Sequence, residues 1–298
     1  MNTVAKTKKP SRFRTCFCRC ALAALWFALF SIITGSSAAV PQTAKPQRII
    51  SICLQGDQLL LQLVPRQRII ALSVLATDPD ISAHWEAAQG IPVTHGDAEE
   101  LIRLKPDLVL VSSNSSPLTV SALKRMGVQV LELGIPTDFE ELRDQLRLAG
   151  RGLGEEARAE EIVQDMDARL ARLKARQPAL AQRPTALFYF QDRFTPGTHT
   201  FANAILEVAG FRNLAATFST DIGISTSMES ILLARPQYLI LTRFRETSPT
   251  QTQLCESQPL FHKLGGNTKI LSVSFRHLIS PDPSNLELAE MLQARLTP

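Results

Sequence analysis

Short runs of consecutive apolar residues alternate with amphipathic segments along the chain from about residue 47 onward. An unbroken apolar run between turn residues is typical of a strand buried on both faces, whereas apolar residues every three or four positions indicate a helix. Strands that alternate with helices predict a parallel sheet covered by helices on both faces. The predicted strands are 48–53, 68–74, 91–94, 107–113 and 128–134, and the predicted helices are 56–64, 79–88, 97–105 and 117–126.

A second unit of the same kind begins near Thr185. Its pattern again places apolar runs between amphipathic segments, so we expect a second α/β unit. The predicted strands of this unit are 185–190, 238–242 and 269–274, and its predicted helices are 201–210, 229–235 and 285–296.

The segment between the two units predicts a long connecting helix. Thr137 or Asp138 is placed to cap a first helix, which the glycine-containing stretch 150–154 interrupts. Residues 155–176 then contain neither Gly nor Pro, and their acidic side chains come early and their basic ones late, as the helix dipole favours. Such a helix is about 33 Å long at 1.5 Å per residue. We therefore expect an α/β protein of two Rossmann-like lobes with parallel sheets, joined by a single long α-helix.

The N-terminus has the pattern of an export signal. Six basic residues within the first 20 precede an apolar run of about 13 residues, and small residues follow up to Ala39. The run is shorter than the roughly 20 residues that span a bilayer, although an uncleaved anchor stays an alternative. The expected organisation is a signal peptide at 1–39, an N-terminal lobe at 40–150, an interlobe helix at 151–178 and a C-terminal lobe at 179–298.

Removal of this signal changes the net charge of the chain and therefore what that charge indicates about function. The net charge of the whole chain is +4, and without the six basic residues it becomes about −2, so the basic balance indicates export rather than nucleic-acid binding. Cys53 and Cys255 are the cysteines that follow the signal. An oxidising compartment permits a disulfide, but one cysteine closes a strand and the other falls in a late loop, so we expect two separate thiols.

Two stretches 130 positions apart follow one template, "EELIRLKPDLVLV" from Glu99 and "ESILLARPQYLIL" from Glu229. In each, an acid begins a helical segment, and a basic residue and a proline precede an apolar run. Proline at this junction ends the helix without removing a hydrogen bond of the sheet. Helix–strand units can converge on this pattern, but convergence does not explain the glutamate at the same offset in both halves.

With these stretches the chain resembles the substrate-binding proteins of ABC importers for vitamin B12, iron–siderophores and haem. The resemblance covers residues 47–298. "RIISICLQGDQLLLQLVPRQRIIALS" is similar to the family's opening strand–helix–strand, and "HTFANAILEVAGFRNLA" is similar to a helix of its second lobe. The resemblance implies a periplasmic protein that binds its ligand between two lobes, works with a membrane permease and a cytoplasmic ATPase, and contains no cofactor. We expect a monomer that does not bind nucleic acid, with a small lobe rotation because the connecting helix is stiff.

In that family, acids on equivalent helices of the two lobes form salt bridges with arginines of the permease. The resemblance assigns this role to Glu99 and Glu229, although the adjacent Glu100 leaves the first assignment open by one position. The second stretch has Gln237 where the first has Asp107, which does not affect the glutamates.

Ligands of α/β lobes bind at the carboxyl ends of the strands. Arginines there indicate an anionic ligand, because guanidinium pairs with carboxylates in a bidentate manner. A histidine could be an axial ligand of a haem or corrinoid metal, and Trp85, Tyr189, Phe190 and Phe194 could form apolar walls, with either Tyr189 or Phe190 in the core. The candidate ligand-binding residues are Gln55, His95, Asn114, Arg193, His199, Arg243 and Arg245.

Three other functions remain open. A receptor for a Zn²⁺ or Mn²⁺ ion needs three or four converging His, Asp or Glu ligands, and the sequence has no His-rich loop. An exported enzyme is disfavoured because no nucleophile elbow, HExxH or phosphate-loop motif occurs, and we expect Asp57 and Asp97 to act as helix caps. A sensor that docks on a membrane partner without transport is the third. The sequence leaves the chemical identity of the ligand undetermined.

Overall fold

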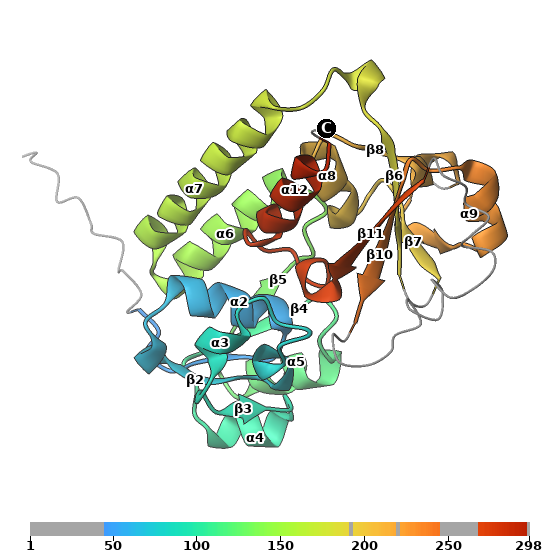
Figure 1. Ribbon diagram of the computed structural model, residues 1–298. Helices are drawn as coiled ribbons and strands as arrows, with labels where there is room; N and C mark the ends of the chain where they lie inside the picture. Colours follow the sequence, from blue (N-terminus) through green and yellow to red (C-terminus); the bar gives the residue numbers. More distant parts are fainter. Residues whose placement is uncertain (1–44, 191–192, 219–220, 245–267, 297–298) are drawn as a thin grey trace, which may run out of the picture. The chain divides into compact units, whose positions relative to one another are not determined.

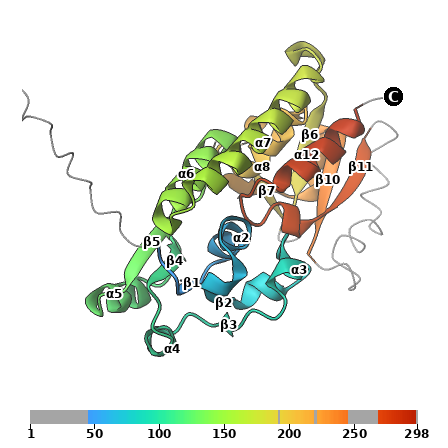
Figure 2. The same ribbon diagram turned by 90° about the vertical axis from the view of Figure 1, so that its left-hand side faces the viewer.

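The computed structural model describes residues 45–190, 193–218, 221–244 and 268–296, which belong to one compact unit, Lys45–Pro298. Two separate parallel sheets form this unit, and helices α6 (Phe139–Leu153) and α7 (Glu156–Ala175) connect them (Figures 1 and 2). The predicted α/β class, with two Rossmann-like lobes, is confirmed. We call the parts built on the two sheets the first and the second lobe.

The first lobe contains a five-stranded sheet in the order β3-β2-β1-β4-β5, with every pair parallel. Three of its four helices match their predicted segments closely. The exception is the predicted helix 79–88, of which only Trp85–Ala88 is helical. The strands are β1 (Ile49–Ser51), β2 (Ile69–Ser73), β3 (Val93–Thr94), β4 (Leu108–Ser112) and β5 (Gln129–Leu133), and the helices are α2 (Leu54–Leu63), α3 (Trp85–Ala88), α4 (Ala98–Arg103) and α5 (Pro117–Arg125).

The second lobe has a four-stranded parallel sheet in the order β11-β10-β6-β8. Strand β8 was not predicted, because two residues are too few to give an apolar run. A short antiparallel pair, β7 with β9, lies outside this sheet. The strands are β6 (Thr185–Tyr189), β7 (Phe194–Pro196), β8 (Arg212–Asn213), β9 (Gly223–Ser225), β10 (Tyr238–Arg243) and β11 (Lys269–Ser274), and the helices are α8 (Phe201–Val208), α9 (Met228–Ala234) and α12 (Asn285–Ala294).

The four strands of the second sheet, β8-β6-β10-β11, follow the same order as β2-β1-β4-β5 of the first. In each lobe, the first strand pairs with the strand that follows the repeated helix, which is β1 with β4 and β6 with β10. Residues 101–110 and 231–240 follow the same order of buried, half-buried and exposed positions. The repeat found in the sequence is therefore one structural unit used twice.

The connecting segment is a pair of packed helices. Asp138 caps α6 through its side chain, and α6 continues through Gly150 to end at Gly154, whose left-handed backbone (φ 69°) lets the chain turn into α7. The break therefore lies at the last glycine of the 150–154 stretch. Two ion pairs, Arg143–Asp167 and Arg147–Glu160, join the two helices.

The lobes share one hydrophobic core. Buried residues of both sheets and of α2, α6, α7, α8 and α12 belong to a single cluster, and the ring of Phe139 on α6 lies 4.8 Å from that of Phe201 on α8. A shared core resists large rotations, because separating the lobes would expose apolar surface to water.

One sequence assignment changes in the structure. Asp57 is not a helix cap: it lies fully buried inside α2, where its carboxylate accepts hydrogen bonds from the backbone N–H (3.0 Å) and the hydroxyl of Ser73. Burial raises the pKa of Asp57 to about 7. The Cys53 thiol is free, and burial raises its pKa to about 12; Cys255 lies outside the described residues.

Candidate functional site

All strands of each main sheet run parallel, so their carboxyl ends meet at one edge of that sheet. In the first lobe, Gln55 lies in the first turn of α2, directly after β1, and is buried. Asn114 follows β4 and is exposed. Because β1 and β4 are neighbours in the sheet, these two predicted ligand residues belong to the same edge.

His95 has different neighbours from those we expected. It lines a groove of about 600 Å³ together with Asp97, Glu99, Glu100 and Arg103. The structure thus places His95 beside the predicted docking acid of the first lobe, at the start of α4.

In the second lobe, Arg193 and Arg243 follow or end neighbouring strands. Arg193 has a left-handed backbone (φ 65°), which a residue other than glycine adopts only at a local cost, in the turn after β6. Arg243 ends β10 and is half-buried, and its Nε atom is buried without a hydrogen-bond partner among the described residues. His199 is exposed just before α8, and Arg245 lies outside the described residues.

Four phenylalanines gather at the carboxyl ends of β6, β10 and β11 (Figure 1 shows the strands). Phe190 packs on Phe275, with ring centroids 5.5 Å apart and nearly perpendicular planes, and on Phe194 at 6.0 Å. Phe244 lies 5.5 Å from Phe275. We call Phe190, Phe194, Phe244 and Phe275 the aromatic cluster; all four are half-buried.

Sequence reasoning found only half of this cluster. Phe190 and Phe194 were candidates, but Phe244 and Phe275 were missed, although each comes one or two residues after a predicted strand. That position is the signal that could have identified them. Tyr189 is the core residue of its pair, since it is buried on the opposite face of β6 among Leu187, Met228 and Leu239.

The two predicted docking acids occupy equivalent positions. Glu99 and Glu229 lie in the first turns of α4 and α9, and both are exposed. The neighbouring Glu100 accepts a hydrogen bond of 2.6 Å from the Thr94 hydroxyl, whereas no hydrogen bond or ion pair of the Glu99 carboxylate is found among the described residues. Glu100 is thus held by its own lobe, and Glu99 is available to a partner.

The charge of Glu229 is favoured by its surroundings. Its own backbone N–H and the Ser227 hydroxyl hydrogen-bond the carboxylate, and the nearby charge of Arg193 adds to them, so that the pKa of Glu229 is below its usual value. Arg193 therefore lies close enough to act on Glu229.

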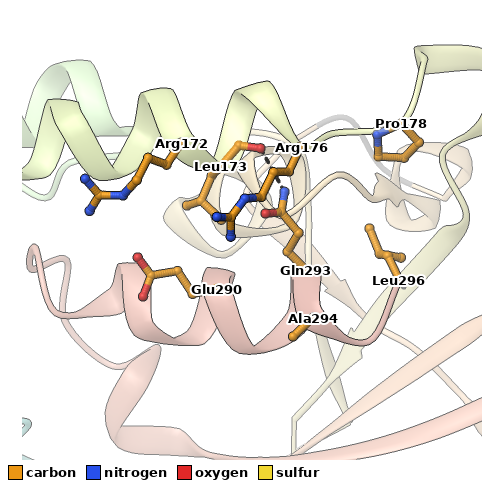
Figure 3. A pocket seen from close by; sticks show the side chains of 8 residues that line it. All are labelled: Arg172, Leu173, Arg176, Pro178, Glu290, Gln293, Ala294 and Leu296. Carbon is orange, nitrogen blue, oxygen red and sulfur yellow. Dashed lines mark hydrogen bonds between the residues drawn. The ribbon is translucent and has the colours of Figure 1, made fainter. Parts of the chain in front are cut away.

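A further groove, of about 650 Å³, lies between α7 and α12 (Figure 3). Arg172 and Arg176 extend from α7 and Glu290 and Gln293 from α12, and Gln293 donates a hydrogen bond of 2.8 Å to the carbonyl of Leu173. Arg169 pairs with Glu290 at its rim. This groove follows a helix–helix contact and contains none of the predicted site residues.

The described residues contain no group of three or more His, Cys, Asp or Glu side chains placed to hold a metal ion. In the same part of the chain, no helix combines the length and the apolar character needed to cross a membrane.

Known proteins resemble this chain in sequence and in fold. A cobalamin-binding protein of Halobacterium salinarum is 24% identical over 209 residues, which cover 70% of this chain and 57% of that protein. An uncharacterized ABC transporter substrate-binding lipoprotein of Bacillus subtilis, YvrC, is 23% identical over 66% of this chain and 64% of its own. The chain thus spans less than two thirds of either relative's length.

A solved structure has the same fold at low sequence identity. The periplasmic haem-binding protein of Pseudomonas aeruginosa has a TM-score of 0.70 and 22% identity, covering 84% of this chain and 92% of its own. The family model described as "Periplasmic binding protein" matches residues 61–264, more than half of the chain. With its two parallel-sheet lobes and this match, the chain belongs to the periplasmic binding protein family.

Proposed function

We propose that this protein is the substrate-binding component of an ABC importer, and that it binds a metal chelate between its lobes and delivers it to a permease. The chelate classes are cobalamin, a ferric siderophore and haem. The observation that carries this proposal is the aromatic cluster beside Arg193 and Arg243 at the carboxyl ends of the second-lobe strands. The names of the relatives, cobalamin-binding and haem-binding, support the same chemistry.

The cluster suits a large ligand with an apolar face. Aromatic rings supply much contact area at a low cost in conformational entropy and pack against flat conjugated systems. The buried Nε of Arg243, which has no hydrogen-bond partner among the described residues, is suited to an acceptor oxygen on the ligand, since an unpaired buried donor carries a desolvation cost. The first lobe would supply Gln55 and Asn114 for polar groups, with His95, His199, Arg193 and Arg245 as further candidates.

Glu99 and Glu229 are the proposed contacts with the permease. Both are exposed acids in the first turn of equivalent helices, one in each lobe. Exposed ion pairs add little affinity one by one, but paired charges fix orientation and accelerate association. Two such acids would orient the protein on a permease that presents arginines.

We further propose that the protein works in the periplasm, with residues 1–39 as its export signal, and that its role is binding rather than catalysis. The pattern of that segment and the family of the chain support this location. The partners would then be the permease, a cytoplasmic ATPase and the ligand.

Absorption titrations with cyanocobalamin, hemin and ferrioxamine B test the ligand class. We expect one of the three to saturate the protein at micromolar or lower concentration. Arg243→Ala should weaken that binding at least tenfold, because a hydrogen bond from a charged donor contributes about 1.5–3 kcal/mol. Arg212→Ala is the matched control, since this exposed arginine begins β8 rather than ending a strand. Failure of all three chelates to bind would contradict the proposal.

A further inference from the structure

One loop of the second lobe, between β11 and α12, contacts the first lobe at two points. Arg276 Nη1 donates a hydrogen bond of 3.2 Å to the carbonyl of Pro79. A few residues later, Asp282 receives hydrogen bonds from first-lobe side chains. The loop also begins with Phe275, which belongs to the aromatic cluster. It therefore links the proposed ligand site to the contact between the lobes.

The carboxylate of Asp282 is the centre of this contact. It is almost completely buried, with 1% of its side chain exposed. Gln62 Nε2 on α2 lies 2.6 Å from one oxygen, and His84 Nε2, at the start of α3, lies 3.1 Å from the other. Since a carboxylate only accepts, both nitrogens donate. A buried charge of this kind is stable only while it keeps such partners.

The loop itself holds Asp282 in place. The Asp282 backbone N–H donates to Asn285 Oδ1 at 2.6 Å, and Asn285 Nδ2 donates to the carbonyl of His277 at 2.7 Å. The backbone N–H of Ser284 adds a third hydrogen bond to the carboxylate, at 2.8 Å. Movement of Asp282 away from the first lobe would thus carry the segment that follows Phe275 with it.

His84 is the titratable donor in this contact. Burial lowers its pKa, but the hydrogen bond and the charge of Asp282, with the charge of Glu287 on α12, outweigh burial and leave the pKa raised. Burial raises the pKa of Asp282, and His84 with Ser284 outweighs it, so that this pKa is lowered.

Other elements packed here bring two cations to the contact, and Glu86 lies on α3 two residues after His84. Arg276 is bound to the Pro79 carbonyl, and Arg158 of α7 donates to the carbonyl of Gln62 at 3.3 Å. Helix α2 contributes the neutral Gln58 and Gln62. Asp282 and Glu287 are the groups that favour the charged form of His84.

We propose that Asp282, Gln62 and His84 form a pH-sensitive latch between the lobes, which fixes the separation of the two halves of the ligand site. The contribution of His84 is complete below its ordinary pKa and is lost as the pH rises through its raised value. The contribution of ionised Asp282 is lost only as the pH falls through its lowered value. The latch is thus strongest between these two limits and weakens towards alkaline pH.

The consequence for the ligand rests on the proposed function, whereas the latch does not. With the latch intact, the aromatic cluster is held against the first-lobe half of the site. When His84 loses its charge, Asp282 keeps its hydrogen bond from Gln62 but loses its cationic partner. The arrangement in which the latch joins the two lobes, which we call closed, is then populated less. Ligand release would then be faster at alkaline pH.

Distance measurements on the ligand-free protein test the latch alone. Spin labels at Leu118→Cys on α5 and Leu233→Cys on α9 report the lobe separation, because both positions are more than 80% exposed. The other cysteines are replaced by serine, except the half-buried Cys53. By pulsed electron paramagnetic resonance, we expect one narrow distance population at pH 5.5. At pH 9 that population should be at least twofold smaller.

Variants separate the latch from other pH effects. His84→Gln keeps a neutral donor, so its distances should be the same at both pH values and match the wild type at pH 9. Asp282→Asn should broaden the distances at both, and Gln62→Leu should reduce the closed population while keeping the pH response. Glu290→Gln removes an exposed acid of α12 that pairs with α7, and should behave as the wild type.

A wild-type distribution that does not change between the two pH values, or a pH response that persists in His84→Gln, would overturn the latch. Stopped-flow release of whichever of cyanocobalamin, hemin or ferrioxamine B binds then tests its consequence. A pH-dependent distance without binding of any of the three would refute the proposed ligand class and leave the latch intact.

Discussion

The two lobes use one scaffold but present different chemistry at their strand ends. In both, a helix with an exposed acid leads through a basic residue in the left-handed region (Lys105 and Arg235, each φ 48°) into a buried strand. In the first lobe β1, β2 and β4 end in serine, whereas in the second lobe a phenylalanine directly follows β6, β10 and β11, and Arg243 ends β10. The shared part thus serves folding and the proposed docking, and the differing part belongs to the proposed ligand site.

The difference between Asp107 and Gln237 at one position of the repeat preserves the role of that position. Asp107 accepts hydrogen bonds from the backbone N–H groups of Gln47 (2.8 Å) and Arg48 (2.9 Å), just before β1. Gln237 accepts one from the N–H of Thr185 at the start of β6, at 2.9 Å. The carboxylate of Asp107 and the amide oxygen of Gln237 therefore both hold the first strand of their lobe against its neighbouring strand.

The largest expected effect tests the proposed docking acids, which the two lobes have in common. The double variant Glu99→Ala/Glu229→Ala should reduce uptake of the bound chelate tenfold or more in cells that contain the permease, because both orienting charges are lost. The affinity for the ligand, measured by titration, should stay within twofold of the wild type. Glu100→Ala is the matched control and should leave uptake nearly unchanged. A collapse of ligand affinity in the double variant would place these acids in the ligand site instead.

An intermediate effect tests the strand ends, where the two lobes differ. Phe275→Ala should weaken ligand binding about tenfold, since loss of an aromatic contact costs on the order of 1–2 kcal/mol, whereas Asn114→Ala should change it less than threefold. Both are measured by the same absorption titration. Circular dichroism confirms that each variant folds. Equal losses at the two positions would mean that both lobes bind the ligand alike.

The smallest expected effect concerns the scaffold. Asp107→Ala should lower the free energy of unfolding by about 1 kcal/mol, because two N–H groups lose a charged acceptor at an exposed site. Gln237→Ala removes one such bond and should cost about half as much. Urea unfolding followed by circular dichroism measures both. A larger loss for Gln237→Ala would show that the two residues are not equivalent.

The sequence predicted most of the fold because strong patterns encode it. Strands β1, β2, β4, β6, β10 and β11 are apolar runs, and the long helix α7 has its charges arranged along the dipole. Strand β8 gave no such signal, since pairing with β6 rather than its own pattern makes two residues a strand. Asp57 was misassigned for a similar reason: only the proximity of β2 brings Ser73 to its carboxylate.

Part of the candidate site could be predicted from the sequence. Its candidate arginines and two of the four phenylalanines follow from the rule that ligands bind at the carboxyl ends of strands. The rule does not say which side chains meet, so it missed Phe244 and Phe275. The choice between Glu99 and Glu100 likewise required the position of Thr94, six residues before Glu100 in the chain.

The sequence by itself therefore determined most elements of each lobe and their repetition, and it limited the proposed docking acids to Glu229 and either Glu99 or Glu100, because these depend on short-range periodicity and on spacing within one helix–strand unit. Only the tertiary structure decided which residues from distant segments come into contact. Gln62 and His84 meet Asp282 about 200 residues later, because packing of the two lobes around one core brings them together. A buried carboxylate needs donors wherever the fold can supply them, and no local pattern in the chain records where those donors are.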